Sequence, residues 1–195
     1  MPSSLVRRGS PSAADPTKAA ARSRGLTEVG GYALGLPIGV VALWRTGMTA
    51  ALPAGLGLAA VARSDLATHR FSLAELRVVA SIVALCGLLD TVVSAEWQRL
   101  GGTVLIAGLT VLAILLLWLT TSVVAFGDVV LVAFALPVPA SLSPRAVGTM
   151  LFVALVVGGV TGVVQRVRRT TISTSDRVAF GPALLAGWLV GVTVG

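Results

Sequence analysis

Seven apolar runs fill the chain after residue 28, and they constrain the fold more than any other feature of the sequence. The runs cover residues 29–44, 46–62, 76–95, 101–124, 129–143, 146–165 and 178–195. A helix needs about 20 residues, at about 1.5 Å each, to cross roughly 30 Å of hydrocarbon. The first and fifth runs are short for this purpose, and either can form a half-span or cross a thinned region. We predict an all-α, polytopic transmembrane helical bundle of six to seven spans, with seven as the best count.

The composition agrees with a membrane protein. Hydrophobic residues make up 55% of the 195 residues and charged residues only 12%, whereas roughly 25% of the residues in a soluble domain are charged. The net charge of +7 comes from short loops and an N-terminal tail. That distribution is typical of an inner (plasma) membrane protein and not of a phosphate-binding face. We therefore expect the lipid bilayer as a partner, and no nucleic acid.

The N-terminal segment differs from the remainder of the chain. Residues 1–26 are rich in Ser, Pro, Ala and Arg, which predicts a disordered basic tail. Arg7-Arg8 resembles a twin-arginine export signal, but the first apolar run begins only near Val29 and no cleavage site is evident. We therefore predict that the first run stays as an anchor and that residues 27–195 form one transmembrane domain.

The Lys and Arg residues predict the orientation. With the tail in the cytoplasm, 12 of the 15 basic residues lie inside and 3 lie outside. The inner set is Arg7, Arg8, Lys18, Arg22, Arg24, Arg63, Arg70, Arg77, Arg166, Arg168, Arg169 and Arg177, and the outer set is Arg45, Arg99 and Arg145. This excess predicts a cytoplasmic N-terminus and, with seven spans, an outer C-terminus.

Two acidic residues lie at the predicted cytoplasmic ends of apolar runs. Asp65, in "VARSDLATHRF", ends the second run, and Asp128, in "AFGDVVL", lies between the fourth and fifth. The topology thus brings both carboxylates to the same membrane depth. Each has a structural alternative: Asp128 can cap the fifth helix while Gly127 ends the fourth, and Asp65 can form an exposed ion pair with Arg63 or Arg70.

A pair of such carboxylates can cleave a peptide bond. Two carboxylates a few ångströms apart cannot both ionise, so they share one proton. The ionised member takes a proton from the attacking water, while the protonated member polarises the peptide carbonyl and helps to protonate the leaving amine. Such a site needs no metal and no other cofactor.

Three other reactive groups are weaker candidates. Asp90, in "GLLDTVV", lies within the third run, where an acid is a functional candidate by default, but it is near the outer end. The single histidine, His69, can be a metal ligand with Asp65 or a surface loop residue. The single cysteine, Cys86, excludes a disulfide framework or a four-thiolate zinc site.

Three motifs together resemble the type IV prepilin peptidases. "SDLATHRFS" resembles the stretch in which Asp-Leu precedes a Thr and then an Arg before Ile-Pro-Asn. "AFGDVVL" resembles the Gly-x-Gly-Asp motif of the wider group of intramembrane aspartic proteases. "VAFGPALLAG", residues 178–187, resembles the Pro-Phe-Gly-Pro-Phe-Leu stretch that opens the last span. The resemblance covers about residues 46–195.

This resemblance implies an aspartic endopeptidase that removes the basic leader of a prepilin-like substrate, a type IV or Flp pilin or a pseudopilin, at the cytoplasmic membrane face. Asp65 and Asp128 would be its catalytic residues, and Gly127 and Arg70 would support them. The bifunctional members also methylate the new N-terminus and carry a cytoplasmic domain with two Cys-x-x-Cys pairs. With one cysteine, the chain is similar to the short forms, and no methyltransferase activity is expected.

The sequence also departs from the pattern of that family. Ala125 replaces the first glycine of the Gly-x-Gly-Asp motif, Val130 replaces a lysine, and Phe71-Ser72-Leu73 replaces Ile-Pro-Asn. None of these changes removes a catalytic atom. The alternative is a non-enzymatic membrane protein, either a divergent pilin-binding homologue or a small transporter, for which Asp90 is the one favourable feature. The sequence indicates no oligomeric state.

Overall fold

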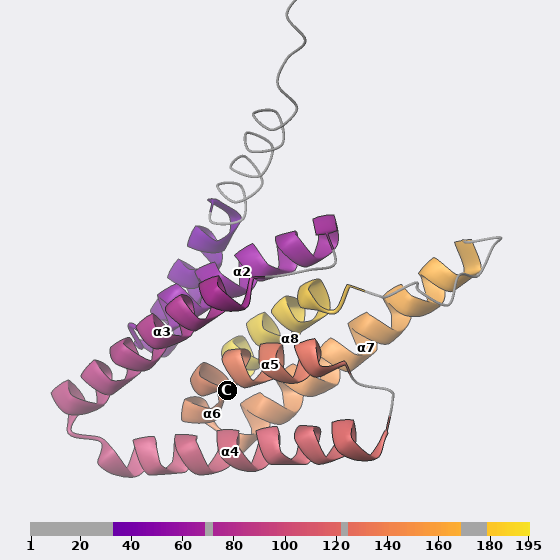
Figure 1. Ribbon diagram of the computed structural model, residues 1–195. Coiled ribbons are helices and arrows are strands. Elements are labelled where there is room, and N and C mark those ends of the chain that lie inside the picture. Colours follow the sequence, from indigo (N-terminus) through magenta and orange to yellow (C-terminus); the bar gives the residue numbers. More distant parts are fainter. Residues whose placement is uncertain (1–32, 69–71, 122–124, 169–178) are drawn as a thin grey trace, which may run out of the picture.

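The described part of the computed structural model covers residues 33–68, 72–121, 125–168 and 179–195 and consists of helices joined by short turns and loops. The all-α prediction is confirmed for these residues (Figure 1). The helices are Ala33–Thr46, α2 (Ala51–Thr68), α3 (Leu73–Ser94), α4 (Trp97–Thr120), α5 (Phe126–Ala135), α6 (Pro137–Leu142), α7 (Pro144–Arg168) and α8 (Gly181–Val194). The predicted tail, residues 1–26, lies outside the described residues.

Three of these helices are long and apolar enough to cross a membrane, as expected of a membrane protein. They are α3, α4 and residues Pro144–Val167 of α7. Helix Ala33–Thr46, α5 and α8 are apolar but shorter. Each of the seven apolar runs contains helix, although the number that cross a bilayer stays a prediction.

The fifth apolar run is divided into two short helices. α5 closes with the hydrogen bond from the Leu136 N–H to the Val132 carbonyl (3.0 Å), and α6 begins at Pro137. Proline has no N–H to continue the helical ladder and favours the first turn of a new helix. Pro144 starts α7 in the same way. The run that is short for a span is therefore not a single helix.

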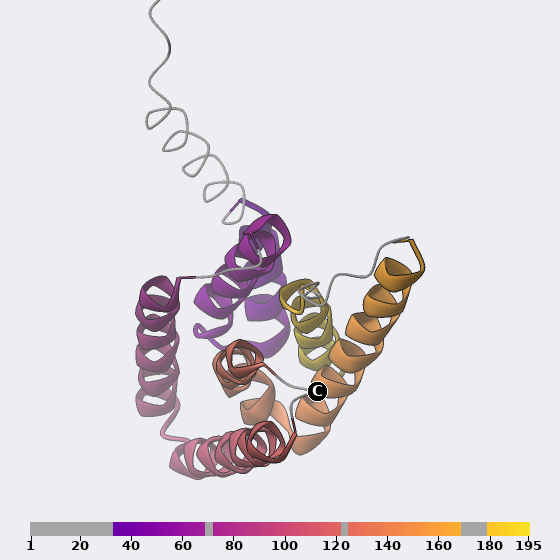
Figure 2. The same ribbon diagram turned by 45° about the vertical axis from the view of Figure 1, so that its right-hand side comes forward.

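Helix α8 lies at the centre of the bundle, in contact with α2, α5, α6 and α7 (Figure 2). Its Trp188 is fully buried, and its Gly187 and Gly191 lie against α7. A Cβ atom at Gly187 would collide with the carbonyl oxygen of Met150, and one at Gly191 would lie 2.7 Å from that of Ala146. Small residues thus let the two helices approach closely, as is common in membrane proteins.

The glycine repeat of the first apolar run has the same effect. A Cβ atom at Gly35 would lie 2.8 Å from the Cα of Leu56, and one at Gly39 would lie 2.6 Å from the carbonyl oxygen of Leu52. These two glycines therefore form a closely packed small face on the first helix. The first helix is thereby held against α2.

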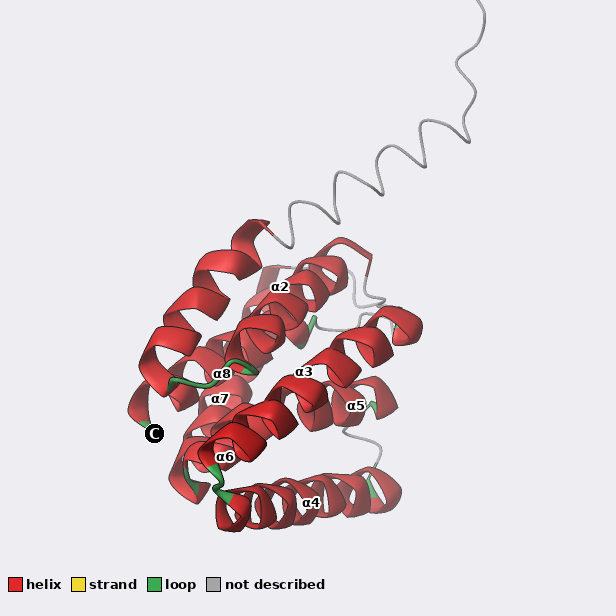
Figure 3. Ribbon diagram, turned by 90° about the vertical axis from the view of Figure 1, so that its left-hand side faces the viewer, coloured by secondary structure: helices red, strands yellow, loops and turns green. Residues whose placement is uncertain are grey.

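Helices α3 and α4 form the periphery of the bundle (Figures 2 and 3). No residue of α4 is buried, and in α3 only Leu76, Val83 and Thr91 are. α3 packs against α2, and α4 packs against α5 and α6, but on the opposite side of each helix the apolar side chains are exposed. In a bilayer this is the surface that lipid would contact.

Several turns and helix ends meet at one end of the bundle. The guanidinium of Arg45 donates to the carbonyl of Thr193 at 2.9 Å, so the first helix ends beside the C-terminus. At the same end, the Arg99 Nε donates to the carbonyl of Ser141 at 3.0 Å. Two of the three basic residues assigned to the outer side are therefore held at this end. The third, Arg145, lies in the first turn of α7, which starts three residues after Ser141.

Candidate aspartate site

Asp65 contacts the first residue of α8. It lies in the last turn of α2, and its Oδ2 accepts a hydrogen bond of 2.8 Å from the backbone N–H of Gly181. The first N–H groups of a helix have no partner within that helix, so the carboxylate satisfies one of these donors. The hydrogen bond joins two of the three family-like motifs, which are 116 residues apart in the chain.

The contact depends on the absence of a side chain at Gly181, which is buried. A Cβ atom there would lie 3.0 Å from the Cα of Ala62 and 3.1 Å from Oδ2 of Asp65. Both distances are shorter than an ordinary van der Waals contact. Pro182 follows within the first turn of α8 and brings no further N–H to this crowded position.

Asp128 lies in the first turn of α5. Its Oδ2 accepts a long hydrogen bond of 3.4 Å from the N–H of Ala125, the residue that precedes the helix. Two residues before Asp128, the ring of Phe126 packs 5.4 Å from that of Trp118 on α4, measured between centroids. Asp128 therefore caps its own helix weakly, at a position that α4 helps to fix.

Gly127 is part of α5 and does not end the fourth helix. α4 ends at Thr120, and α5 begins at Phe126. The interpretation in which Gly127 terminates one helix while Asp128 caps the next is therefore wrong for Gly127. Gly127 is half-buried beside Asp128.

The electrostatics of Asp128 connect it with Asp65. Asp128 precedes the predicted span 129–143, and burial raises the pKa of its carboxyl group. The N–H of Ala125 opposes this rise, and the negative charge of Asp65 adds to it. The structure thus brings the two predicted site aspartates within electrostatic range of each other, because α2 and α5 both pack against α8.

The other predicted site residue, Arg70, lies outside the described residues, as do His69 and Phe71. Ser72 is described, and its hydroxyl accepts the N–H of Glu75 at 3.3 Å. It therefore caps α3, and a proline at this position could not do so. This departure from the family pattern has a local structural role.

Asp90 has a different environment. Its Oδ1 accepts the hydroxyl of Thr49 at 2.8 Å, and its Oδ2 accepts the N–H of Ala50 at 3.3 Å. It thereby caps the start of α2 from the neighbouring helix. Ala51 and Asp65 are 14 positions apart on α2, so the two acids lie about 20 Å apart along the helix axis at about 1.5 Å per residue.

The described residues contain no group of three or more His, Cys, Asp or Glu side chains that could hold a metal ion. Sequence reasoning did not identify Gly181 as the partner of Asp65. The available signal was the Gly-Pro pair in "VAFGPALLAG", since a glycine directly before a helix-starting proline can mark a close backbone approach.

Comparison with known proteins yields no match: no protein family, no curated protein sequence and no solved structure matches the chain. The resemblance to prepilin peptidases therefore rests on the three motifs alone. In the structure these motifs begin or end three helices, α2, α5 and α8, that contact one another.

Proposed function

We propose that this protein is a membrane-embedded aspartic endopeptidase in which Asp65 and Asp128 activate a water molecule. One observation carries the proposal: the N–H of Gly181 holds Asp65 where its charge acts on Asp128. Paired carboxylates whose environments differ are typical of acid–base catalysis. The motif resemblance adds the reaction type, which geometry alone does not specify.

The environments of the two carboxylates suggest separate roles. Asp128, whose pKa is raised by burial, holds the shared proton and donates it to the peptide carbonyl oxygen. Gly181 donates to Oδ2 of Asp65. The other oxygen, Oδ1, has no hydrogen-bond partner among the described residues. It therefore takes the proton of the attacking water. When the tetrahedral intermediate collapses, Asp65 passes this proton to the leaving amine, and Asp128 regains one from the intermediate.

The proposed substrate is a prepilin-like protein with a basic leader, a small residue before the cut and an apolar helix after it. Such a leader is retained in the cytoplasm by its positive charge. The proposed orientation has the N-terminus and both aspartates at the cytoplasmic side of the plasma membrane. The 12-to-3 distribution of basic residues supports it, as does the meeting of Arg45 and Arg99 at the end of the bundle away from Asp65.

A non-enzymatic homologue is the second candidate, and the hydrogen bond from Ala125 to Asp128 favours it. A carboxylate that only caps a helix would need no catalytic partner. The transporter alternative loses its main feature, since Asp90 caps the start of α2.

The experiment that separates these candidates is direct. The purified protein is incubated in detergent with a prepilin-like protein, and mass spectrometry detects a product shortened by its leader. Cleavage that is lost in Asp128→Asn supports the peptidase, whereas no product from any prepilin-like substrate supports the binding protein.

A further inference from the structure

A pocket lies between the peripheral helices and the broken helix pair, away from the aspartate site. Its volume is about 480 Å³, within the range of about 300–1,000 Å³ that is usual for small-molecule sites. Small side chains make room for it, among them Ala80, Ala84 and Gly87 of α3, Ala107 of α4, Ala133 of α5 and Pro137 of α6.

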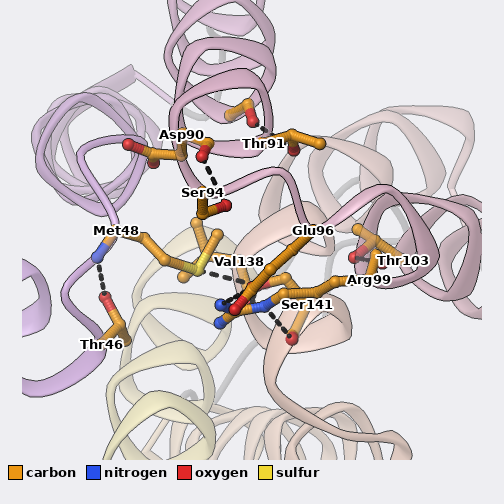
Figure 4. Close-up of polar contacts among 11 residues, drawn as sticks. Thr46, Met48, Asp90, Thr91, Ser94, Glu96, Arg99, Thr103, Val138 and Ser141 are labelled. Carbon is orange, nitrogen blue, oxygen red and sulfur yellow. Dashed lines mark hydrogen bonds and ion pairs between the residues drawn. The ribbon is translucent and has the colours of Figure 1, made fainter.

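The hydroxyl groups in the pocket wall are already engaged as donors. Thr91 donates to the carbonyl of Gly87 at 2.8 Å, and Thr103 donates to that of Arg99 at 2.8 Å. Ser94 does the same with the carbonyl of Asp90 at 2.7 Å (Figure 4). Each bond lies within one helix, so these side chains present mainly carbon to the pocket. The interior therefore suits a hydrocarbon chain.

Charged groups gather at one end of the pocket. The guanidinium of Arg99 donates to Glu96 at 2.9 Å and to the carbonyl of Ser141 at 3.0 Å. The side chains of Arg99 and Glu96 are 41% and 50% exposed, and Nη2 of Arg99 has no partner among the described residues. Asp90 also lines the pocket, with its two oxygens accepting hydrogen bonds from Thr49 and Ala50. The pocket wall thus carries one positive and two negative charges.

The outer walls of the pocket are two of the helices long enough to cross a membrane, α3 and α4. Because the outer sides of these helices carry exposed apolar residues, an occupant would enter from the bilayer. A ligand that matches both parts of the pocket is amphiphilic, with an apolar chain and a polar head.

We propose that this pocket binds one acyl chain of a zwitterionic phospholipid, with the lipid phosphate at Arg99 and the lipid ammonium near Glu96 and Asp90. The balance of charge selects this head group. An anionic lipid would meet two carboxylates and a single guanidinium, whereas a zwitterionic head has a favourable partner for each of its charges. The binding does not depend on the proposed peptidase activity.

The first test uses the unaltered full chain in nanodiscs that contain equal amounts of phosphatidylethanolamine and phosphatidylglycerol. Either lipid carries a photoreactive diazirine in one acyl chain, and labelled residues are mapped by mass spectrometry. We expect phosphatidylethanolamine to label pocket residues of α3, α4 and α6 about tenfold more than phosphatidylglycerol does. Equal labelling by both lipids, labelling spread over the outward face of α4, or stronger labelling by phosphatidylglycerol would overturn the proposal.

Two variants with matched controls complete the test. Ala84→Trp fills the pocket and should abolish pocket labelling, whereas Leu85→Trp, at an exposed neighbouring position that does not line the pocket, should retain it.

The second variant tests the head group. Arg99→Gln should reduce the preference for phosphatidylethanolamine about tenfold, the scale of one charge-assisted hydrogen bond. The control Arg145→Gln, at an exposed position, should not. Unchanged labelling in Ala84→Trp, or an unchanged preference in Arg99→Gln, contradicts the proposal. Asp128→Asn should label like the unaltered protein, so a failed peptidase assignment leaves this result intact.

Discussion

The N–H of Gly181 donates a 2.8 Å hydrogen bond to Oδ2 of Asp65, and no side chain could be added to that glycine without displacing one of the two helices. This contact fixes one oxygen of the carboxylate and leaves the other without a partner among the described residues. It also places the positive end of the α8 dipole at a negative charge, an arrangement that is electrostatically favourable. The start of α8 is therefore part of the candidate site.

The first prediction concerns the two aspartates. Asp65→Asn and Asp128→Asn should each reduce leader cleavage by at least about 10²–10⁴-fold, the usual contribution of a general acid or base. The amide is nearly isosteric but cannot accept a proton from water at neutral pH. Cleavage is measured by mass spectrometry, and size-exclusion chromatography verifies folding. The control Asp90→Asn should stay active, since Asn caps a helix about as well as Asp. Full activity in Asp128→Asn would show that this residue only caps α5.

The second prediction concerns stability and pH. The pKa of Asp128 is raised from its ordinary value of 3.8, so the folded protein retains this proton to a higher pH than the unfolded chain does. Stability is therefore lost as the pH rises through that interval. Asn does not titrate, so Asp128→Asn should melt above the unaltered protein at neutral pH, and the difference should vanish well below pH 3.8.

Asp65→Asn provides the control for this measurement. It removes the negative charge that helps to raise the pKa of Asp128, so the stabilising effect of Asp128→Asn should be smaller in that background. Thermal unfolding of the four proteins in detergent completes the cycle. A lower melting temperature for Asp128→Asn at neutral pH would mean that the ionised carboxylate is required as a helix cap.

The third prediction concerns Gly181. Gly181→Ala should separate α8 from α2 by a few tenths of an ångström and weaken the hydrogen bond to Asp65. We expect kcat to fall roughly 10- to 100-fold, the value of one hydrogen bond to a charged group, with little change in KM. The control is Gly158→Ala, whose Cβ would meet Phe180 at an ordinary 3.5 Å. An unchanged kcat in Gly181→Ala would mean that Asp65 acts without support from α8.

The fourth prediction concerns the packing of α7 against α8. Gly187→Ala should destabilise the protein by about 1–3 kcal/mol, as is typical of overpacking, because the new methyl group collides with the carbonyl of Met150. Gly148→Ala on α7 is the matched control. Its Cβ has nothing within 4 Å, and alanine is the better helix former, so stability should stay equal or rise. Chemical unfolding in mixed micelles measures both, and equal effects would contradict the packing described.

The fifth prediction concerns orientation. Reporter fusions directly after Thr68 and after Arg168 should both indicate the cytoplasm. The C-terminal ends of α2 and α7 lie on the side to which 12 of the 15 basic residues are assigned. A fusion after Gly195 should indicate the outer side. A periplasmic signal at either of the first two positions would rule out the seven-span topology and, with it, the cytoplasmic placement of Asp65.

Helix positions were largely predictable from the sequence, because hydropathy and proline act over short segments. The third run, 76–95, contains most of α3, and the fourth, 101–124, most of α4. The division of the fifth run at Pro137 was not predicted, although its physical signal, a ring without an N–H in the middle of a short run, is local. That Asp65 and Asp128 lie at the same membrane depth was predicted by counting the spans between them.

The partners of the acidic residues were decided by the tertiary structure alone. Asp65 and Asp90 are both acids on apolar helices, and their sequences did not indicate that one accepts the N–H of Gly181 while the other caps the start of α2. Those partners are 116 and about 40 residues away. The first reaches Asp65 when α8 packs against α2, and the second reaches Asp90 when α3 packs against α2. The sequence by itself determined the helices and their apolar faces, since these depend on neighbouring residues. The packing of α8 and α3 against α2 determined which carboxylate meets which donor, because these donors are distant in the sequence.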